Sequence, residues 1–326
     1  MNIKRILSAS FAAALLTVAH TGSPMAKTLK CWANHAMDYP VNIGMVEMGK
    51  IIEEKTGGKY KIKVFPSGTL GDENSIIDQI RGGIVDCGTL NSGPLSEIVQ
   101  EIKFLNLPYL FKSPDHMLRV MNSPVGREID ALVTKYDMVP VAYYGSGARS
   151  FYTTNKPIKT PEDLEGLKVR VMSTAVFVDT VNALGAKATP MPFPEVYTAL
   201  KTGVVDGAEN NWPSYESTGH FEVAKYYSLD RHTVTPEPVV FSAKLWDSLS
   251  DEEKKIFKEA GIASQDVMYA AWDKRVEKSK EIALKGGAQV FEVDPALFQA
   301  KVKPVWDKYV TDAETKALIE RLKAVK

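Results

Sequence analysis

The feature that most constrains the fold is a unit of helix, glycine stop and apolar strand that occurs twice. Residues 76–91 read IIDQIRGGIVDCGTLN, and residues 196–211 read VYTALKTGVVDGAENN. Each unit holds a helical stretch, a glycine that ends it, an apolar pair, an aspartate and a strand that finishes on asparagine. Two such units far apart in the chain predict two similarly built α/β domains.

Further strand and helix signals surround both units. YKIKVFP, at 60–66, alternates apolar residues with lysines, which is typical of a strand. Alternating strands and helices predict a parallel α/β sheet with helices on its faces. Besides the repeated units, strands are expected at 138–147 and 167–172, and helices at about 41–54, 174–185 and 192–203.

One helix near the C-terminus is expected to be much longer than the others. Ser250 is a suitable N-cap and Glu253 stands at the capping-box position, while Gly286 and Gly287 end the helical pattern. At 1.5 Å per residue such a helix would be about 50 Å long. This exceeds the diameter of a small domain, so the helix is expected to run across both domains.

Length and charge narrow the class of protein. The chain has 326 residues, enough for two domains, and 44% of them are hydrophobic, which is typical of a globular protein. Forty Lys and Arg balance forty Asp and Glu. This balance argues against a nucleic-acid partner, which would favour a basic excess.

The N-terminus predicts export. Lys4 and Arg5 precede an apolar stretch at 6–19, and small residues follow as far as Ala26. This pattern is typical of a secretory signal peptide, expected here at 1–26, and its apolar run is too short for a membrane span. The mature protein is therefore expected in the periplasm.

Two cysteines, Cys31 and Cys87, remain after removal of the signal peptide. An oxidising compartment permits a disulfide between them. Each also lies in an expected strand, so two buried free thiols fit the sequence equally well.

Motifs of enzymes are missing from the sequence. It contains no G-x-S-x-G nucleophile elbow, no H-E-x-x-H zinc motif and no G-x-x-x-x-G-K-[ST] phosphate loop. The histidines of the mature chain show no spacing of a local metal pair. The missing motifs weaken the interpretation as an enzyme without excluding it, and no catalytic residue, metal or cofactor is assigned.

Polar side chains instead gather at the ends of the expected strands. In open α/β sheets, ligands bind at the carboxyl ends of the strands. Amides and guanidinium groups at these positions predict a polar cleft for an anion that forms hydrogen bonds. The residues concerned are Asn34, His35, Asn91, Ser92, Arg149, Arg170, Asn210 and Asn211.

Several segments together resemble one family. GTLGDE at 68–73, DLEGLKVRVM at 163–172, TPMPFPEVYTALKTGVVDGAEN at 189–210 and the long C-terminal helix are similar to the solute-binding proteins of tripartite ATP-independent periplasmic (TRAP) transporters. The resemblance implies two α/β lobes that are joined by strands and close on a ligand between them. It also implies delivery of the ligand to a membrane permease with a small and a large subunit.

The resemblance gives a role to Arg170. From the strand pattern alone, Lys168 and Arg170 share one face and could be two solvated cations. Members of the family place at the position of Arg170 an arginine that pairs with the ligand carboxylate. A guanidinium suits this role, because its planar fork matches a carboxylate with two parallel hydrogen bonds.

Further site residues follow from the same resemblance. Asn210 matches an asparagine that contacts the ligand carboxylate, Arg149 a second arginine, and Phe193 an aromatic that packs on the ligand. Glu73 matches an acidic position that accepts ligand hydroxyls, although an acid at a helix N-terminus is also favoured by the helix dipole. The remaining first-lobe contacts are expected from Asn34, His35, Asn91, Ser92 and Gly93.

The ligand class follows from a narrower resemblance. ENNWPSYES at 209–217 and HFEVAKYYSLDRHTVTPE at 220–237 resemble the branch of the family that binds hexuronates such as D-glucuronate and D-galacturonate. Asn211 would then add a polar contact, and Trp212 would either stack on the sugar or belong to the core. Another organic acid, such as a dicarboxylate or 2-oxo acid, and a uronate hydrolase or lyase are the alternatives.

The two lobes are expected to share the C-terminal part of the chain. The first would hold 27–147 and about 236–275, and the second 148–235 and about 276–326. Strands near 142–150 and 232–242 would connect the lobes and act as a hinge.

Overall fold

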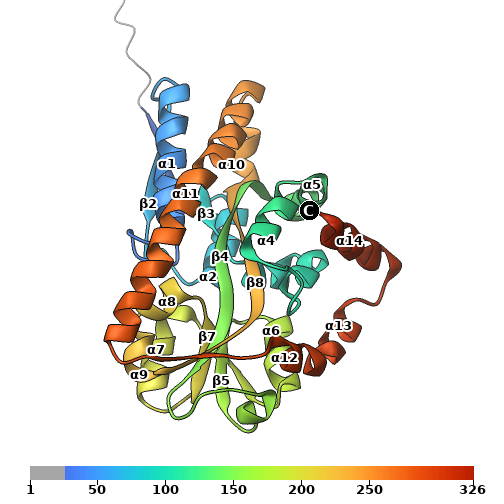
Figure 1. Ribbon diagram of the computed structural model, residues 1–326. Helices are drawn as coiled ribbons and strands as arrows, with labels where there is room; N and C mark the ends of the chain where they lie inside the picture. Colours follow the sequence, from blue (N-terminus) through green and yellow to red (C-terminus); the bar gives the residue numbers. More distant parts are fainter. Residues whose placement is uncertain (1–25) are drawn as a thin grey trace, which may run out of the picture.

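The computed structural model describes residues 26–326, and the expected signal peptide lies outside these residues except for Ala26. The described chain folds into two α/β lobes, one above the other in Figure 1, joined through a continuous sheet. The sheet has nine strands in the described residues, in the order β2-β1-β3-β8-β4-β7-β5-β6, with β9 paired to β8. The strands are β1 (Lys27–Trp32), β2 (Tyr60–Phe65), β3 (Cys87–Thr89), β4 (Met138–Thr153), β5 (Lys168–Val171), β6 (Lys187–Pro190), β7 (Gly207–Asn210), β8 (Tyr226–Ser242) and β9 (Gln289–Glu292).

The sheet is mixed, so the expectation of a parallel sheet was wrong for its centre. Within each lobe the strands are parallel: β1 pairs with β2 and β3, and β5 pairs with β6 and β7. At the centre, β8 runs antiparallel to β3 and β4, and β4 antiparallel to β7. The reason is topological, because β4 carries the chain from the first lobe to the second and β8 carries it back.

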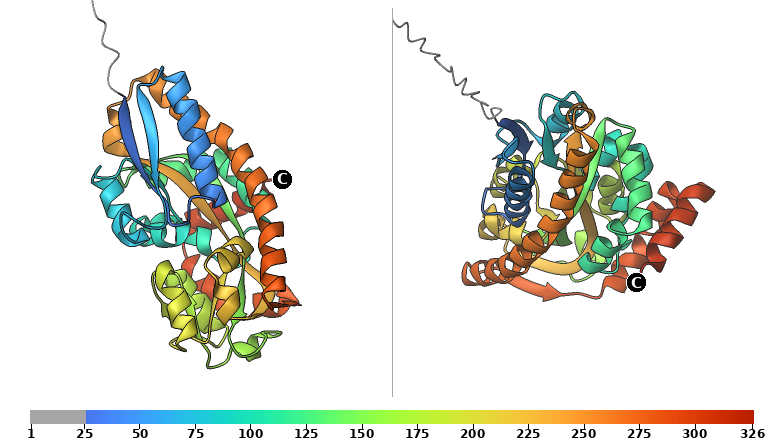
Figure 2. Two further views of the ribbon diagram at one scale, coloured as in Figure 1. Left: turned by 90° about the vertical axis from the view of Figure 1, so that its left-hand side faces the viewer. Right: turned by 90° about the horizontal axis from the view of Figure 1, so that it is seen from above.

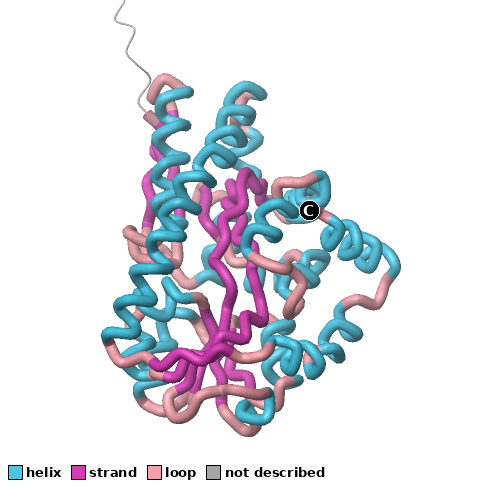
Figure 3. Tube along the Cα trace, in the orientation of Figure 1, coloured by secondary structure: helices cyan, strands magenta, loops and turns pink. Residues whose placement is uncertain are grey.

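The two crossing strands β4 and β8 run side by side through both lobes, as the magenta pair in Figure 3 shows. Their register is broken between Gly145 and Ala148 and again between Arg149 and Phe151. Gly147 has φ +65°, and a Cβ there would lie 2.9 Å from Trp272 of the long helix. Arg231, on the opposite strand, has φ 49°. Irregular pairing of this kind concentrates bending at the level of the gap between the lobes.

Helices cover the faces of the sheet in both lobes (Figure 2). Their positions follow the sequence signals: Gly82 ends the helix that precedes β3, and Thr160 with Asp163 forms a capping box. The α-helices of the first lobe and the connecting region are α1 (Pro40–Lys55), α2 (Glu73–Arg81), α3 (Ser92–Ile98), α4 (Pro114–Met121), α5 (Pro124–Thr134), α10 (Ala243–Asp247) and α11 (Asp251–Lys285). The others are α6 (Ala175–Ala183), α7 (Val196–Lys201), α8 (Trp212–Ser217), α9 (His220–Val223), α12 (Pro295–Lys301), α13 (Lys303–Tyr309) and α14 (Ala313–Ala324), with 3₁₀ turns η1 (Gln100–Asn106), η2 (Pro161–Leu164) and η3 (Phe193–Glu195).

The long helix α11 confirms the expectation from its caps. Ser250 and Glu253 form both bonds of the capping box, and Gly286 follows the last helical residue. The helix contacts α1, β4 and α8, and in Figure 1 it passes obliquely along both lobes. It is therefore a common support for the two lobes.

The C-terminal segment does not stay with the second lobe. Helix α13 contacts α6 of that lobe, whereas α14 returns to contact α5 of the first lobe. Arg321 of α14 binds both carboxylate oxygens of Glu128 on α5. Helix α14 thus packs against the first lobe, and the expected lobe boundaries stay a prediction.

Cys31 and Cys87 lie on the neighbouring strands β1 and β3, where they face each other in register. Their Cα atoms are 4.4 Å apart, and the two residues are joined by a disulfide. Of the two possibilities that the sequence left open, the structure has the disulfide.

The contact between α11 and β4 gives the first prediction. Gly261 of α11 lies against β4, and a Cβ at this position would come within 2.8 Å of the Val141 carbonyl oxygen. Replacing glycine by alanine inside a helix normally stabilises by about 1 kcal/mol. Here we expect Gly261→Ala to lower the free energy of unfolding instead, by about 1–3 kcal/mol, because a backbone atom cannot yield without moving the strand.

Chemical denaturation of Gly261→Ala and of the neighbouring Ile262→Ala measures this effect. The Ile262 side chain is 58% exposed, so its truncation should change stability little. A Gly261→Ala variant more stable than the parent protein would contradict the close packing of α11 on β4.

Candidate ligand-binding site

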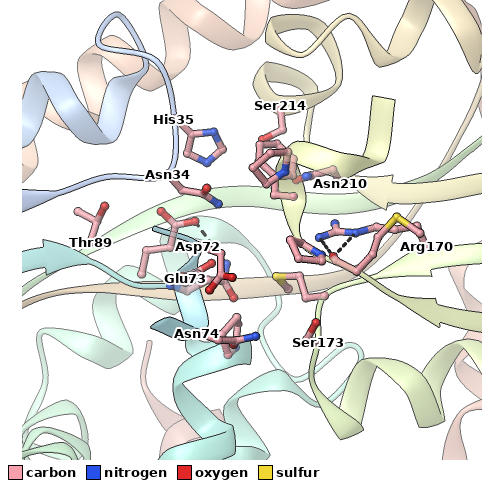
Figure 4. Close-up of a pocket in the computed structure, with 18 of the residues that line it drawn as sticks. Asn34, His35, Asp72, Glu73, Asn74, Thr89, Arg170, Ser173, Asn210 and Ser214 are labelled. Atoms are coloured by element: carbon pink, nitrogen blue, oxygen red, sulfur yellow. Dashed lines mark hydrogen bonds between the residues drawn. The ribbon is translucent and has the colours of Figure 1, made fainter. Parts of the chain in front are cut away.

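A polar cavity lies between the two lobes, at the carboxyl ends of β1, β3, β5 and β7. Figure 4 shows Asn34, His35 and Glu73 on one side of it and Arg170 and Asn210 on the other. The sequence-predicted residues that line the cavity are Asn34, His35, Glu73, Asn91, Arg149, Arg170, Phe193, Asn210 and Asn211. The two lobes therefore bring most of the candidate residues together.

Arg170 is a buried cation without an acidic partner. Its side chain is 2% exposed, and among the described residues no carboxylate lies within ion-pair distance of it. Nε and Nη2 donate to the Met191 carbonyl oxygen at 3.0 and 2.7 Å, which leaves the outer edge of the guanidinium free for another acceptor. Burial lowers the pKa of Arg170 to about 10, with partial compensation from the Glu209 charge. The side chain remains charged at neutral pH.

Arg149 is almost fully occupied by protein groups. Nε and Nη2 donate to the two carboxylate oxygens of Glu209 at 2.5 and 2.8 Å, and Nη1 donates to Asn210 Oδ1 at 2.9 Å. A further bond goes from Nη2 to the Glu209 carbonyl oxygen. Arg149 therefore lines the cavity, but its charge is already neutralised within the protein.

Glu209 and His232 complete this buried network. Burial would raise the pKa of Glu209, but the charges of Arg149 and His232 outweigh it and hold the pKa at about 2. His232 Nδ1 lies 2.8 Å from Asp230 Oδ2, and its Nε2 lies 3.5 Å from Glu209 Oε2. Burial lowers the pKa of His232, while the two carboxylates raise it, with a net value of about 9.

Asn210 and Asn211 are oriented by this network and by a helix cap. The Asn210 Oδ1 accepts from Arg149 and from the Asn211 backbone N–H, so its NH₂ group is the donor left for a ligand. Asn211 is the N-cap of α8, where its Oδ1 accepts from the Ser214 N–H at 2.8 Å. The Asn211 NH₂ group likewise donates to no described residue, so both amides can offer donors to a ligand in the cavity.

Glu73 is half-buried at the start of α2, after the N-cap Asp72. Its Oε1 accepts from the Asn91 backbone N–H at 2.5 Å. Burial raises the pKa of Glu73 to about 8; the hydrogen bond from Asn91 lowers it and the nearby charge of Glu237 raises it further. Among the described residues, the Asn91 N–H is the donor that this carboxylate receives. Its remaining acceptor positions face the cavity, where a ligand can donate to them.

His35 and Phe193 meet across the cavity from opposite lobes. The His35 ring stacks on Tyr39 at 3.8 Å and touches Phe193 edge-on at 5.2 Å. Phe193 also lies 5.9 Å from the Arg170 guanidinium. Burial, with the charges of Arg149 and Arg275, lowers the pKa of His35 to about 3, so the ring is neutral.

Three predicted residues lie elsewhere. Ser92 and Gly93 form the first turn of α3 and do not line the cavity; the Ser92 hydroxyl donates to Asn106, and the Gly93 N–H to Asn91. Trp212 lines a different cavity, with Trp272 and Tyr269 of α11, behind the crossing strands. Their role as ligand contacts remains a prediction that this geometry does not favour.

Several lining residues were missed from the sequence. Among them is Glu237, which stands between two prolines in TPEPVV. It belonged to the expected hinge strand and to the segment that resembles the hexuronate branch, but was not itself expected to bind the ligand. Glu209, the partner of Arg149, was also missed, although it lies behind Arg149 and does not itself line the cavity. The other lining residues that were missed are Asp72, Asn74, Thr89, Pro94, Met172, Ser173, Met191, Pro192, Pro194 and Ser214.

Polar contacts hold the two lobes together around the cavity. Glu97 of α3 accepts from the Thr174 hydroxyl and the Ala175 backbone N–H, both at 3.0 Å, at the start of α6. On another side, the Tyr39 hydroxyl lies 2.9 Å from Ser214 Oγ of α8. The structure therefore has the lobes in contact with each other around the site.

Comparison with known proteins identifies the family. Residues 33–312 match the bacterial extracellular solute-binding proteins, family 7. This protein belongs to that family. A solute-binding protein of Chromohalobacter salexigens is 40% identical over 309 residues, which cover 94% of this chain and 92% of the relative.

Two solved structures support the same assignment. A TRAP periplasmic solute-binding protein of a Sulfitobacter species with bound β-D-galacturonate is 44% identical, with a TM-score of 0.88 over 91% of this chain and 99% of that one. Another, from Chromohalobacter salexigens with bound D-glucuronate, is 39% identical, with a TM-score of 0.89 over 91% of this chain and 100% of that one. The two-lobed fold and the resemblance to TRAP solute-binding proteins are confirmed.

Within 26–326 no helix combines the length and the apolar character that a bilayer crossing requires. The same residues hold no group of three or more His, Cys, Asp or Glu side chains that could bind a metal ion.

The network around His232 gives a prediction on stability and pH. A histidine with a folded pKa of about 9 and an ordinary value of 6.5 stabilises the fold fully below pH 6.5, and this contribution is lost as the pH rises through 9. We expect the stability advantage of the parent protein over His232→Gln to be larger at pH 6 than at pH 9, by on the order of 2–3 kcal/mol. Denaturant unfolding of both proteins at the two pH values measures the difference. An advantage independent of pH would mean that His232 is not held in its charged form.

Proposed function

We propose that this protein is a periplasmic receptor that binds a sugar acid of the D-glucuronate or D-galacturonate type and delivers it to a TRAP permease. The observation that carries the proposal is the buried Arg170, whose charge no carboxylate of the described residues neutralises. A buried charge without a partner is costly, so the site favours a ligand that supplies an anion. A ligand carboxylate on the outer edge of the guanidinium would do so with two parallel hydrogen bonds.

The rest of the cavity suits a hydroxylated ring. Glu73 offers carboxylate oxygens that lack donors, Asn210 offers an amide, and Phe193 offers an apolar surface. Hydroxyl groups donate to carboxylates, and the C–H face of a sugar packs on an aromatic ring. The bound D-glucuronate and β-D-galacturonate of two similar proteins support the same ligand class.

The role as a receptor rather than an enzyme is part of this proposal. The family is one of extracellular solute-binding proteins, which supports a binding role and a location outside the cytoplasmic membrane. In such a role the two lobes release the ligand to small and large permease subunits in the membrane. Prolonged incubation with a bound uronate should therefore yield no product.

Arg170 gives the most direct test of the carboxylate site. We expect Arg170→Ala to lose tight uronate binding, because truncating one partner of a buried charge pair costs about 2–5 kcal/mol. Arg170→Lys should also bind poorly, since an ammonium keeps the charge but not the planar fork. Isothermal titration calorimetry measures both affinities.

Lys168 provides a matched control on the same strand. Its ammonium donates to the Gly203 carbonyl oxygen at 3.0 Å, outside the cavity. Lys168→Ala should therefore bind uronates like the parent protein. Binding by Arg170→Lys that equals the parent affinity would sink the argument from guanidinium geometry.

Glu73 gives a test of the ligand class. Above its pKa of about 8 this carboxyl is ionised, accepts hydroxyls and repels a second anionic group. At pH 8.5 we expect D-glucuronate or D-galacturonate to raise the melting temperature, and succinate and malate to leave it unchanged. Glu73→Gln should weaken the effect of the uronates and allow the dicarboxylates to bind.

Thermal-shift measurements of both proteins with both ligand sets carry out this test. If succinate stabilised the parent protein while the uronates did nothing, the ligand would be a dicarboxylate. The assignment to the solute-binding family would stand in either case.

A further inference from the structure

A second carboxylate, Glu237, lines the same cavity, although it was not among the site residues expected from the sequence. It lies on the crossing strand β8, opposite Tyr144 of β4, and its side chain is 7% exposed. Pro236 and Pro238 flank it, and each proline fixes the backbone angle φ at its own position. The direction of the Glu237 side chain is thus set by the least adjustable part of β8.

Asn91 links Glu237 to Glu73. The Asn91 backbone N–H donates to Glu73 at 2.5 Å, while its side-chain amide lies 3.1 Å from the Thr235 hydroxyl and 3.4 Å from Glu237 Oε1. Thr235 is held in turn by the Ser146 hydroxyl at 2.9 Å. One asparagine therefore fixes the spacing of the two carboxylates along the cavity wall.

Neither carboxylate is neutralised by a cation. In the part of the chain that the structure describes, no Lys, Arg or His group forms an ion pair with Glu73 or Glu237. Arg149, the nearby cation, is committed to Glu209. An ionised carboxylate can accept about four hydrogen bonds. The contact from the Asn91 amide to Glu237 is long, at 3.4 Å, and is therefore a weak hydrogen bond.

Burial disfavours the ionised form of the Glu237 carboxyl group. It raises the pKa of Glu237 to about 7, against which the hydrogen bonds from Asn91 and Ser146 and the charge of Arg149 act only in part. The protein could have satisfied this side chain by a lysine or arginine, as it does for Glu209. A carboxylate that is buried, aimed into a ligand cavity and short of donors is suited to receive them from the ligand.

We infer that Glu237 is a ligand-binding residue that accepts a hydrogen bond from a ligand hydroxyl, side by side with Glu73. This inference rests on the proposed function and narrows it. With Arg170 on the anion and two carboxylates elsewhere in the cavity, the receptor selects monocarboxylates that carry at least two hydroxyls away from the acid group. A ligand with the carboxylate but without one of these hydroxyls leaves a buried carboxylate unpaired and is rejected.

Calorimetry with D-glucuronate and its 2-deoxy, 3-deoxy and 4-deoxy analogues tests the inference, at pH 8.5 where Glu237 is ionised. For the parent protein, the analogue that lacks the hydroxyl bound by Glu237 should bind at least about tenfold more weakly than D-glucuronate, the loss expected for a hydrogen bond to a charged group. Glu237→Gln should bind D-glucuronate about tenfold more weakly than the parent does. The ratio of its affinity for D-glucuronate to its affinity for that one analogue should fall to about threefold or less.

Two further variants separate recognition from a structural effect. Glu237→Asp keeps the charge, but its carboxylate lies one methylene further from the ligand. It should therefore no longer distinguish D-glucuronate from that analogue, while its melting temperature stays near that of the parent. Glu292→Gln removes an exposed carboxylate on β9 that pairs with Arg231, far from the cavity lining, and should leave all four affinities unchanged.

The outcomes are distinct. Equal weakening of all four ligands by Glu237→Gln and Glu237→Asp, or an unchanged preference among them, would overturn the role of Glu237 and leave the uronate receptor intact. A parent protein that binds none of the four ligands would overturn the proposed function, and the inference with it. Loss of discrimination at a single hydroxyl supports both.

Discussion

The antiparallel pairing of β4 with β8 is the constraint on which the rest of the structure depends. These two strands connect the lobes, and their pairing extends the parallel strands of each lobe into a single sheet. Because the strands of both lobes end at the same gap, their carboxyl ends deliver polar residues from two directions. The crossing strands add Arg149 and Glu237 between them. The register breaks around Gly147 and Arg231 confine the irregular backbone to this level, while α11 supports it from behind.

The two arginines of the cavity show how context divides similar side chains between structure and binding. Arg149 is held by both oxygens of Glu209, so its charge orients Asn210 and ties β4 to β7. Among the described residues, Arg170 donates only to the Met191 carbonyl oxygen, and its charge is left without an ion-pair partner. The same balance applies to the acids, since Glu209 is ion-paired whereas Glu73 and Glu237 form no ion pair within residues 26–326. The groups left without a protein partner describe the ligand: one anion and several hydroxyl donors.

The sequence predicted the parts of this arrangement that depend on local pattern. The ends of α11, the glycine after α2 and the strand that carries Arg170 follow from capping residues and alternation, which act within a few residues. It predicted a parallel sheet because each βαβ unit is local, and it missed the antiparallel centre because that pairing joins residues almost a hundred positions apart, as with Tyr144 and Glu237. It treated Arg149 like Arg170, since only the folded structure shows that Glu209 reaches the first and not the second. Glu237 was overlooked because its importance comes from burial and from the lack of an ion-pair partner among the described residues, neither of which is a property of the segment TPEPVV.

Under the proposed function, the same charges couple ligand binding to the contact between lobes. The anion site lies on the second lobe at Arg170, and the hydroxyl acceptors lie on the first lobe and on β8. A ligand that satisfies both sides must therefore span the gap. Bringing the lobes together without such a ligand buries one cation and two carboxylates that do not reach one another, which opposes closure. A sugar acid supplies a partner to each of these groups. Its binding therefore stabilises the closed arrangement of the lobes more than the open one. Contacts such as Glu97 with the start of α6 and Tyr39 with Ser214 then need only modest strength to hold the lobes in place.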